Sequence, residues 1–222
     1  VWADQTSLGG DNGIAVAMIL AILADDTLPH PPLEAVFTVD EEVGMDGAFA
    51  LDCSDLKGKK LLNLDSEEEG IFTVSCAGGM RADCTLPGKR EPLGGESCYA
   101  VTLSGLQGGH SGGDIDKGRG SANALMGRVL YSAMEQLSGL RLAAIQGGRF
   151  DNVICSRCDA VIAVPAGKEA ELEQFIRGFD ATLKNEYAGC DAGVTLECAK
   201  TEAASAVSAE TTSVMLHTLF AL

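Results

Sequence analysis

Residues 99–137 read YAVTLS-GLQGGHSGGDIDKGRG-SANALMGRVLYSAMEQL, and they decide the fold of the second half of the chain. The β-branched and aromatic residues at 99–104 predict a strand. The glycine-rich positions 105–120 predict a loop, and the spaced apolar residues of 121–137 predict a helix. A strand, a loop and a helix in this order open a β-α-β unit.

The rest of this half continues with elements of the same kinds. Toward the C-terminus, the pattern predicts two strands, a helix and a further strand, at 140–146, 160–164, 168–187 and 193–198. The complete order is β-α-β-β-α-β, the ferredoxin-like α+β unit, with its core at about 98–199. A last helix is predicted at about 209–222.

The first half has a different pattern. An Asp-Asn-Gly run at 11–13 precedes a helix that apolar residues nearly encircle, and its Asp or Asn would cap that helix. Two apolar runs, 35–39 and 60–65, predict buried strands that end in acidic residues. A helix among parallel strands is the βαβ pattern of α/β folds, whose ligand sites collect at the carboxyl ends of the strands. The Gly-, Pro- and Cys-rich stretch 75–96 predicts a boundary between the halves.

The composition restricts the classes of function. With 46% hydrophobic and 22% charged residues, the chain can bury a core, and disorder is not expected. Its 16 basic and 32 acidic residues give a formal charge of −16, which repels phosphate backbones, so no nucleic-acid partner is expected. No apolar run reaches the roughly 18 residues of a membrane span, so no membrane partner is expected. The start at Val1 and the end inside an apolar run are typical of an internal fragment or a processed product.

The eight cysteines are spread along a chain that is too long to need disulfides. Reduced thiols and a cytoplasmic location are therefore expected. Cys155 and Cys158 form a single CxxC motif without the second pair that a tetrahedral zinc site needs. This isolation favours ordinary cysteines beside a strand.

Three acidic clusters stand where a predicted helix begins or a predicted strand ends: Asp11, residues 40–42 and Asp65. Carboxylates gathered in a partly dry site repel one another unless a cation lies between them. Hard oxygen ligands from several loops suit a divalent metal, and a shared carboxylate suits a pair of metals. The alternative is that Asp11 caps the helix while the other acids face solvent. The residues alone leave both interpretations open.

Four motifs carry a family resemblance. They are SLGGDNG at 7–13, TVDEEVGMDGA at 38–48, NLDSEE at 63–68 and GLQGGHSGG at 105–113. In this order they resemble the aminoacyl-histidine dipeptidases, which belong to the aminoacylase and carnosinase superfamily of two-zinc metallopeptidases. The EExGMDGA and GGHSGG patterns are specific, whereas DNG alone would be weak.

The resemblance implies roles for four acidic residues. Asp11 would bridge two zinc ions, with manganese or cobalt as possible replacements, and Glu42 and Asp65 would each ligate one of the metals. Glu41 would be the general base that takes a proton from metal-bound water.

The resemblance also implies roles for two residues of the second half. His110 resembles the histidine that reaches a partner subunit's active site and stabilises the oxyanion. Asn152, by its position in the Arg-Phe-Asp-Asn loop at 149–152, resembles the family's substrate-contacting asparagine. The substrate would be a small peptide, and the protein would be a homodimer formed through this half.

The chain departs from the family pattern in two places. It contains neither the His-x-Asp motif expected upstream of Asp11 nor the histidine expected far downstream, and imidazole suits zinc better than oxygen does. We therefore expect a truncated catalytic domain at 1–74, a lid and dimerisation domain at 75–222, and an isolated chain that is inactive. The parent would hydrolyse Xaa-His dipeptides. The alternatives are a non-catalytic dimerisation or scaffold fragment, and a related tripeptidase or acyl-amino-acid hydrolase.

Overall fold

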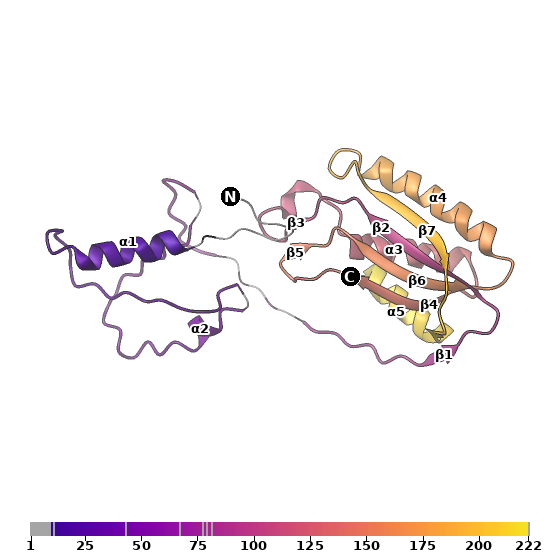
Figure 1. The fold of residues 1–222 in the computed structure, drawn as a ribbon, viewed down its shortest axis with the longest axis horizontal. Helices are drawn as coiled ribbons and strands as arrows, with labels where there is room; N and C mark the ends of the chain where they lie inside the picture. Colours follow the sequence, from indigo (N-terminus) through magenta and orange to yellow (C-terminus); the bar gives the residue numbers. More distant parts are fainter. Residues whose placement is uncertain are drawn as a thin grey trace. The chain divides into compact units, whose positions relative to one another are not determined.

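The chain divides into two compact units, Val1–Arg81 and Ala82–Leu222 (Figure 1). The computed structural model describes residues 10, 12–42, 44–66, 68–76, 78, 80 and 82–221. The boundary between the units follows Arg81, whereas the sequence pattern placed it after residue 74.

The second unit is built on a four-stranded sheet with the order β4-β6-β2-β7. Every neighbouring pair in this sheet is antiparallel. Two helices connect its strands, α3 between β2 and β4 and α4 between β6 and β7. This order is that of a ferredoxin-like unit, which confirms the prediction from the sequence. The bounds are β2 Ser97–Ser104, α3 Ala122–Gln136, β4 Arg141–Gly147, β6 Cys158–Val164, α4 Glu169–Glu186 and β7 Thr195–Thr201.

One face of this sheet forms the core of the unit. Along β2, Tyr99, Val101 and Leu103 are almost completely buried, whereas the alternate residues 100, 102 and 104 are only half-buried. The core residues of the helices pack on the buried face, and they include Met126, Leu130, Leu172, Leu183 and Leu216. The last of these lies on α5, Ala209–Ala221, which packs on α3 and was also predicted.

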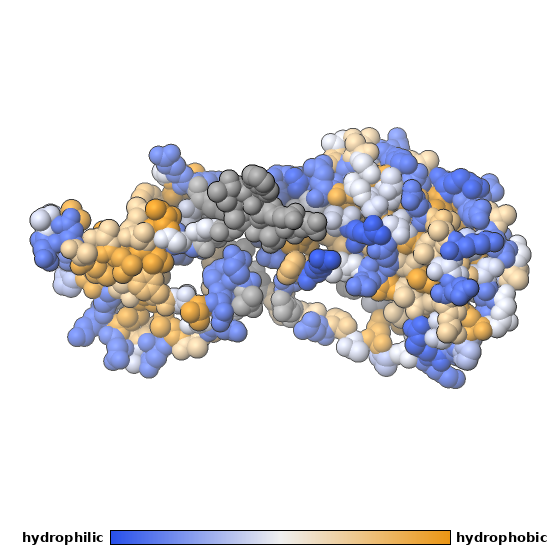
Figure 2. Space-filling model, viewed as in Figure 1, coloured by the Kyte–Doolittle hydropathy of each residue, from blue (hydrophilic) through white to orange (hydrophobic). Residues whose placement is uncertain are grey.

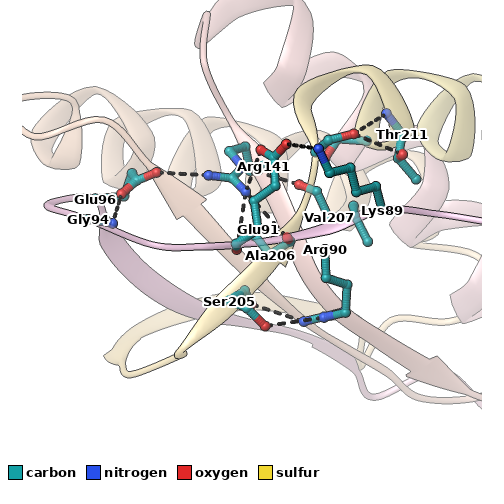
Figure 3. Close-up of polar contacts among 12 residues, drawn as sticks. Lys89, Arg90, Glu91, Gly94, Glu96, Arg141, Ser205, Ala206, Val207 and Thr211 are labelled. Carbon is teal, nitrogen blue, oxygen red and sulfur yellow. Dashed lines mark hydrogen bonds and ion pairs between the residues drawn. The ribbon is translucent and has the colours of Figure 1, made fainter.

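A short ribbon that the sequence did not predict borders the sheet (Figure 3). Its strands are β1, Arg90–Pro92, and β8, Ser205–Val207. Arg141 of β4 donates hydrogen bonds to the backbone carbonyls of two β8 residues at 3.2 and 3.3 Å, and to the Glu96 carboxylate at 3.2 Å. Arg90 donates to a β4 carbonyl and a β8 carbonyl, both at 2.9 Å. The two arginines therefore fasten the ribbon to β4.

The first unit contains two helices among its described residues, α1, Gly13–Ala24, and α2, Asp46–Phe49. The side chain of Asn12 accepts a hydrogen bond from the backbone N–H of Ala15 at 2.9 Å, which confirms that an N-cap residue begins α1. Apolar side chains cover much of the surface of α1 (Figure 2). No helix of the described residues is long and apolar enough to cross a bilayer.

The prediction of two buried strands in the first unit is wrong. Residues 35–39 and 60–65 form no strand pairing, and their apolar side chains are exposed, with Leu61 at 86% and Val39 at 67%. A strand depends on a neighbour for its backbone hydrogen bonds and on a covering layer for its burial. Within the described residues of the first unit, no segment supplies either.

Candidate functional site

A tight turn presents the acidic pair Glu41 and Glu42. The backbone N–H of Met45 donates to the carbonyl of Asp40 at 2.8 Å, and both residues have a left-handed backbone, with φ of 63° and 60°. Such a conformation is unfavourable for a methionine, and it concentrates at functional sites. The turn leaves the two glutamates exposed.

Gly47 allows the segment after this turn to fold back on the residues before it. Its N–H donates to the carbonyl of Val39 at 3.2 Å, and a Cβ at position 47 would lie 2.5 Å from that same oxygen. Any larger residue would displace the backbone here. The GMDGA part of the motif therefore has a local structural function.

A hydrogen bond joins the start of α1 to the third acidic segment. The side-chain N–H of Asn12 donates to the carbonyl of Leu64 at 2.5 Å, and the next residue, Asp65, is exposed. Asp11 lies outside the described residues, so the gathering of Asp11, Glu42 and Asp65 stays a prediction. Within the described part of the chain, no three His, Cys, Asp or Glu side chains are grouped so as to hold a metal ion.

The second unit brings its two predicted site residues together. His110 belongs to β3, Gly109–His110, which pairs with β5, Val153–Ile154. The backbone N–H of Ser111 donates to the carbonyl of Asn152 at 2.9 Å. His110 and Asn152 are both exposed on this small ribbon.

The imidazole of His110 is oriented by its own loop. Its Nδ1 atom accepts hydrogen bonds from the backbone N–H groups of Gly112, at 3.1 Å, and Gly113, at 3.0 Å. An atom that accepts two N–H groups carries no proton, so the neutral ring holds its proton on Nε2. Within the described residues no group is bonded to Nε2, and the ring is exposed. The Nε2–H group of His110 is therefore a donor without a partner in the part of the chain that the structure describes.

Asp114, which was not predicted as a site residue from the sequence, closes the loop behind this histidine. Its carboxylate accepts a hydrogen bond from Lys117 and one from the backbone N–H of His110 at 2.7 Å. These two bonds hold the pKa of Asp114 below its ordinary value, and the bond from Lys117 has the larger effect. The charges of Arg119 and Lys117 lower the pKa further. Arg119 also donates to the carbonyl of Gly108 at 2.6 Å. The signal in the sequence was an acid followed within five residues by two bases in a glycine-rich loop.

The CxxC cysteines lie inside the second unit. Cys155 and Cys158 are both buried, and all eight thiols of the chain are free. Burial, with a smaller contribution from the neighbouring Cys155, raises the pKa of Cys158 to about 12. The thiol is therefore protonated at neutral pH and is not prepared to bind a metal.

Comparisons with known proteins identify relatives in sequence and in fold. Residues 101–190 match the family of M20 peptidase dimerisation domains. Over 190 residues, or 85% of this chain, the sequence is 46% identical to the cytosol non-specific dipeptidase of Escherichia coli (strain K12), of which 39% is covered. The crystal structure of aminoacylhistidine dipeptidase from Vibrio alginolyticus matches 99% of this chain and 45% of its own, at 32% identity and a TM-score of 0.70.

This chain thus spans less than half the length of either relative. The resemblance to aminoacyl-histidine dipeptidases that the four motifs indicated is confirmed, both in sequence and in fold. Residues 101–190 of the second unit are therefore similar to M20 peptidase dimerisation domains, and the chain is similar to a dipeptidase along most of its length.

Proposed function

We propose that the protein containing this chain is a zinc-dependent dipeptidase that hydrolyses Xaa-His and related dipeptides. The observation that carries the proposal is the β3–β5 ribbon, which brings His110, whose Nε2–H has no partner among the described residues, close to Asn152. The names of the related proteins support the same class of reaction. The cytosolic relative supports a cytoplasmic location.

His110 would act as an oxyanion donor. When a peptide bond is hydrolysed, negative charge develops on the scissile carbonyl oxygen, and an N–H group fixed in advance stabilises it. Two backbone hydrogen bonds hold the ring so that Nε2–H points away from its own loop. Asn152, in the turn just before β5, would contact the same substrate through its amide.

The acidic residues of the first unit would supply the other half of the site. Asp11, Glu42 and Asp65 would ligate the metal, and Glu41, next to a ligand but not one itself, would accept a proton from water. When bound, zinc, or manganese or cobalt in its place, would lower the pKa of a bound water and act as a Lewis acid toward the scissile carbonyl. Of the three proposed ligands, Glu42 and Asp65 are described, and their carboxylate oxygens suit such an ion, although the described residues alone form no complete cluster.

The dimerisation domain supports a homodimer in which each His110 serves the partner's site. An edge strand is open to pairing, because β7 ends the sheet order and no other strand of the described residues lies next to its outer edge. A two-fold axis through such an edge, or through the helical face, would join identical copies.

The test uses the full-length protein that contains this chain, with Xaa-His dipeptides, tripeptides and acyl amino acids as substrates. We expect hydrolysis of Xaa-His dipeptides that a chelator abolishes and zinc restores. The Glu41→Gln variant should retain its zinc content and lose at least about two orders of magnitude in kcat. Preference for another substrate would indicate a related tripeptidase or acyl-amino-acid hydrolase. Zinc binding without hydrolysis of any substrate would favour the alternative that the protein is a non-catalytic dimerisation module.

A further inference from the structure

A buried carboxylate lies beneath the loop that carries His110. Asp191 is only 1% exposed, and it follows α4 in the turn that leads to β7. One of its oxygens accepts the backbone N–H of Gln107 and the other accepts the backbone N–H of Gly120, both at 2.7 Å. Asp191 therefore joins the two ends of the loop 107–120.

Further contacts dock the same loop on the same turn. The side chain of Gln107 donates to the carbonyl of Cys190, and the Cys190 thiol donates to the carbonyl of Gly118 at 3.1 Å. Gly105 has φ of +80°, and a Cβ there would overlap the carbonyl oxygen of Gly193. The backbone approaches this closely because both positions are glycine.

The two ends of the loop are connected to the histidine through a second layer of bonds. Arg119, next to Gly120, donates to the carbonyl of Gly108 and pairs with the Asp114 carboxylate. Asp114 in turn accepts the backbone N–H of His110. Asp191 thus holds the two ends of the loop, and the contacts of Arg119 and Asp114 hold the part of the loop that orients the imidazole.

We infer that Asp191 is a positioning residue for His110, an inference that rests on the proposed function of that histidine. A carboxylate that is buried and charged is costly unless its hydrogen bonds are satisfied, and here two backbone N–H groups of one loop satisfy it. The N–H group of Gly120, which is a buried residue, depends equally on Asp191, because burial removes water as an alternative partner. Removing the carboxylate releases both ends of the loop and lets the imidazole leave its orientation.

The direct readout is the state of the His110 ring. The chain has three histidines, so histidine labelled with ¹⁵N gives few signals, and substitution of His30 and His217 assigns them. In the unaltered 222-residue chain we expect the ¹⁵N shifts of a ring protonated on Nε2, together with slow amide exchange at Gly112 and Gly113. In Asp191→Ala the ring should become a mixture of tautomers, and those two amides should exchange at least about tenfold faster.

Asp180→Ala is the matched control. Asp180 also accepts a backbone N–H next to the same turn, that of Leu196 at 2.9 Å, but it makes no bond to the loop. It should leave the His110 ring signals unchanged. Asp191→Asn keeps the shape and one acceptor oxygen, so it should give an intermediate result and serves if Asp191→Ala does not fold.

In the full-length enzyme, Asp191→Ala should lower kcat by about ten- to a hundredfold with little change in KM, because a misplaced donor affects the transition state most. Unchanged ring signals and amide exchange in a folded Asp191 variant would overturn the inference. If His110→Ala retains normal kcat, the proposed role of His110 is wrong, but the ring signals still decide whether Asp191 positions it.

Discussion

The Nδ1 atom of His110 accepts a hydrogen bond from the backbone N–H of Gly113 at 3.0 Å. This bond, together with the one from Gly112, determines which ring nitrogen carries the proton. A backbone donor is used for this purpose, so no side chain needs to stand between the ring and solvent. The backbone of the GGHSGG motif therefore orients the motif's own histidine.

Removing this donor should weaken catalysis in the full-length enzyme. Gly113→Pro has no N–H and leaves the ring with one of its two partners, so we expect kcat to fall by about fivefold, the equivalent of roughly 1 kcal/mol for one hydrogen bond. Gly113→Ala retains the N–H, and its Cβ would lie 3.9 Å from Nδ1, an ordinary contact. Steady-state kinetics of the pair separates the lost hydrogen bond from the added bulk. Equal rates for the Pro and Ala variants would mean that the Gly113 N–H does not help to orient the His110 ring.

The Asp114 carboxylate should make the loop sensitive to acid. Its pKa lies below the ordinary value of 3.8, because Lys117 and the backbone N–H of His110 favour the charged form. A depressed pKa contributes stability that is complete above pH 3.8 and is lost as the pH falls through the lowered value. The His110 amide shift should therefore titrate with a midpoint below 3.8, and Asp114→Asn should abolish that titration. A midpoint above 3.8 would contradict the expectation.

Arg141 should be important for the stability of the second unit. Its side chain is 13% exposed and bonds to Glu96 and to the backbone of the β1–β8 ribbon. Arg141→Ala should lower the free energy of unfolding by about 1.5–3 kcal/mol, the range for hydrogen bonds to a charged group. Arg177→Ala is the control, because that arginine is 72% exposed with an ion pair at 4.0 Å and should cost under about 0.5 kcal/mol. Denaturant unfolding measures both, and similar losses would mean that the ribbon bonds contribute little.

The sequence allowed prediction of the second unit more completely than of the first. The strand at 97–104 was predictable because its alternating pattern of residues matches the alternating burial along β2. That burial follows from packing within the unit, which also contains the partner strands β6 and β7. Residues 60–65 read as a buried strand from composition alone, yet Leu61 and Leu62 are exposed. Hydrophobic composition does not specify the neighbour that a strand needs.

The candidate site divides in the same way. The juxtaposition of His110 and Asn152 depends on the pairing of β3 with β5, two-residue strands too short to be recognised from sequence pattern. Only the resemblance to a known family drew attention to both residues. Asp191 was missed for a different reason: a single Asp after a helix is typical of a solvated turn, and its burial follows from the packing of the glycine-rich loop upon it.

The most demanding prediction concerns the two halves of the proposed site, which would come from different subunits. In the full-length protein, His110→Ala should lose about 2.7–4 kcal/mol of transition-state stabilisation, the loss typical of one oxyanion donor. Glu41→Gln should be nearly inactive for its own reason, the loss of the general base. Neither substitution touches the buried core, since His110 and Glu41 are both exposed, so each variant should still fold and dimerise.

Mixing the two variants then distinguishes action within a chain from action across the dimer. About half of randomly formed dimers contain one subunit of each kind. If His110 acts in trans, the subunit with intact Glu41 receives an intact His110 from its partner, so each mixed dimer has one complete site and activity should return to about a quarter of that of the unaltered enzyme. If His110 acts within its own chain, every site in the mixture carries one defect. Activity that stays at the level of the separate variants, with subunit exchange verified by mass spectrometry, would exclude the shared site.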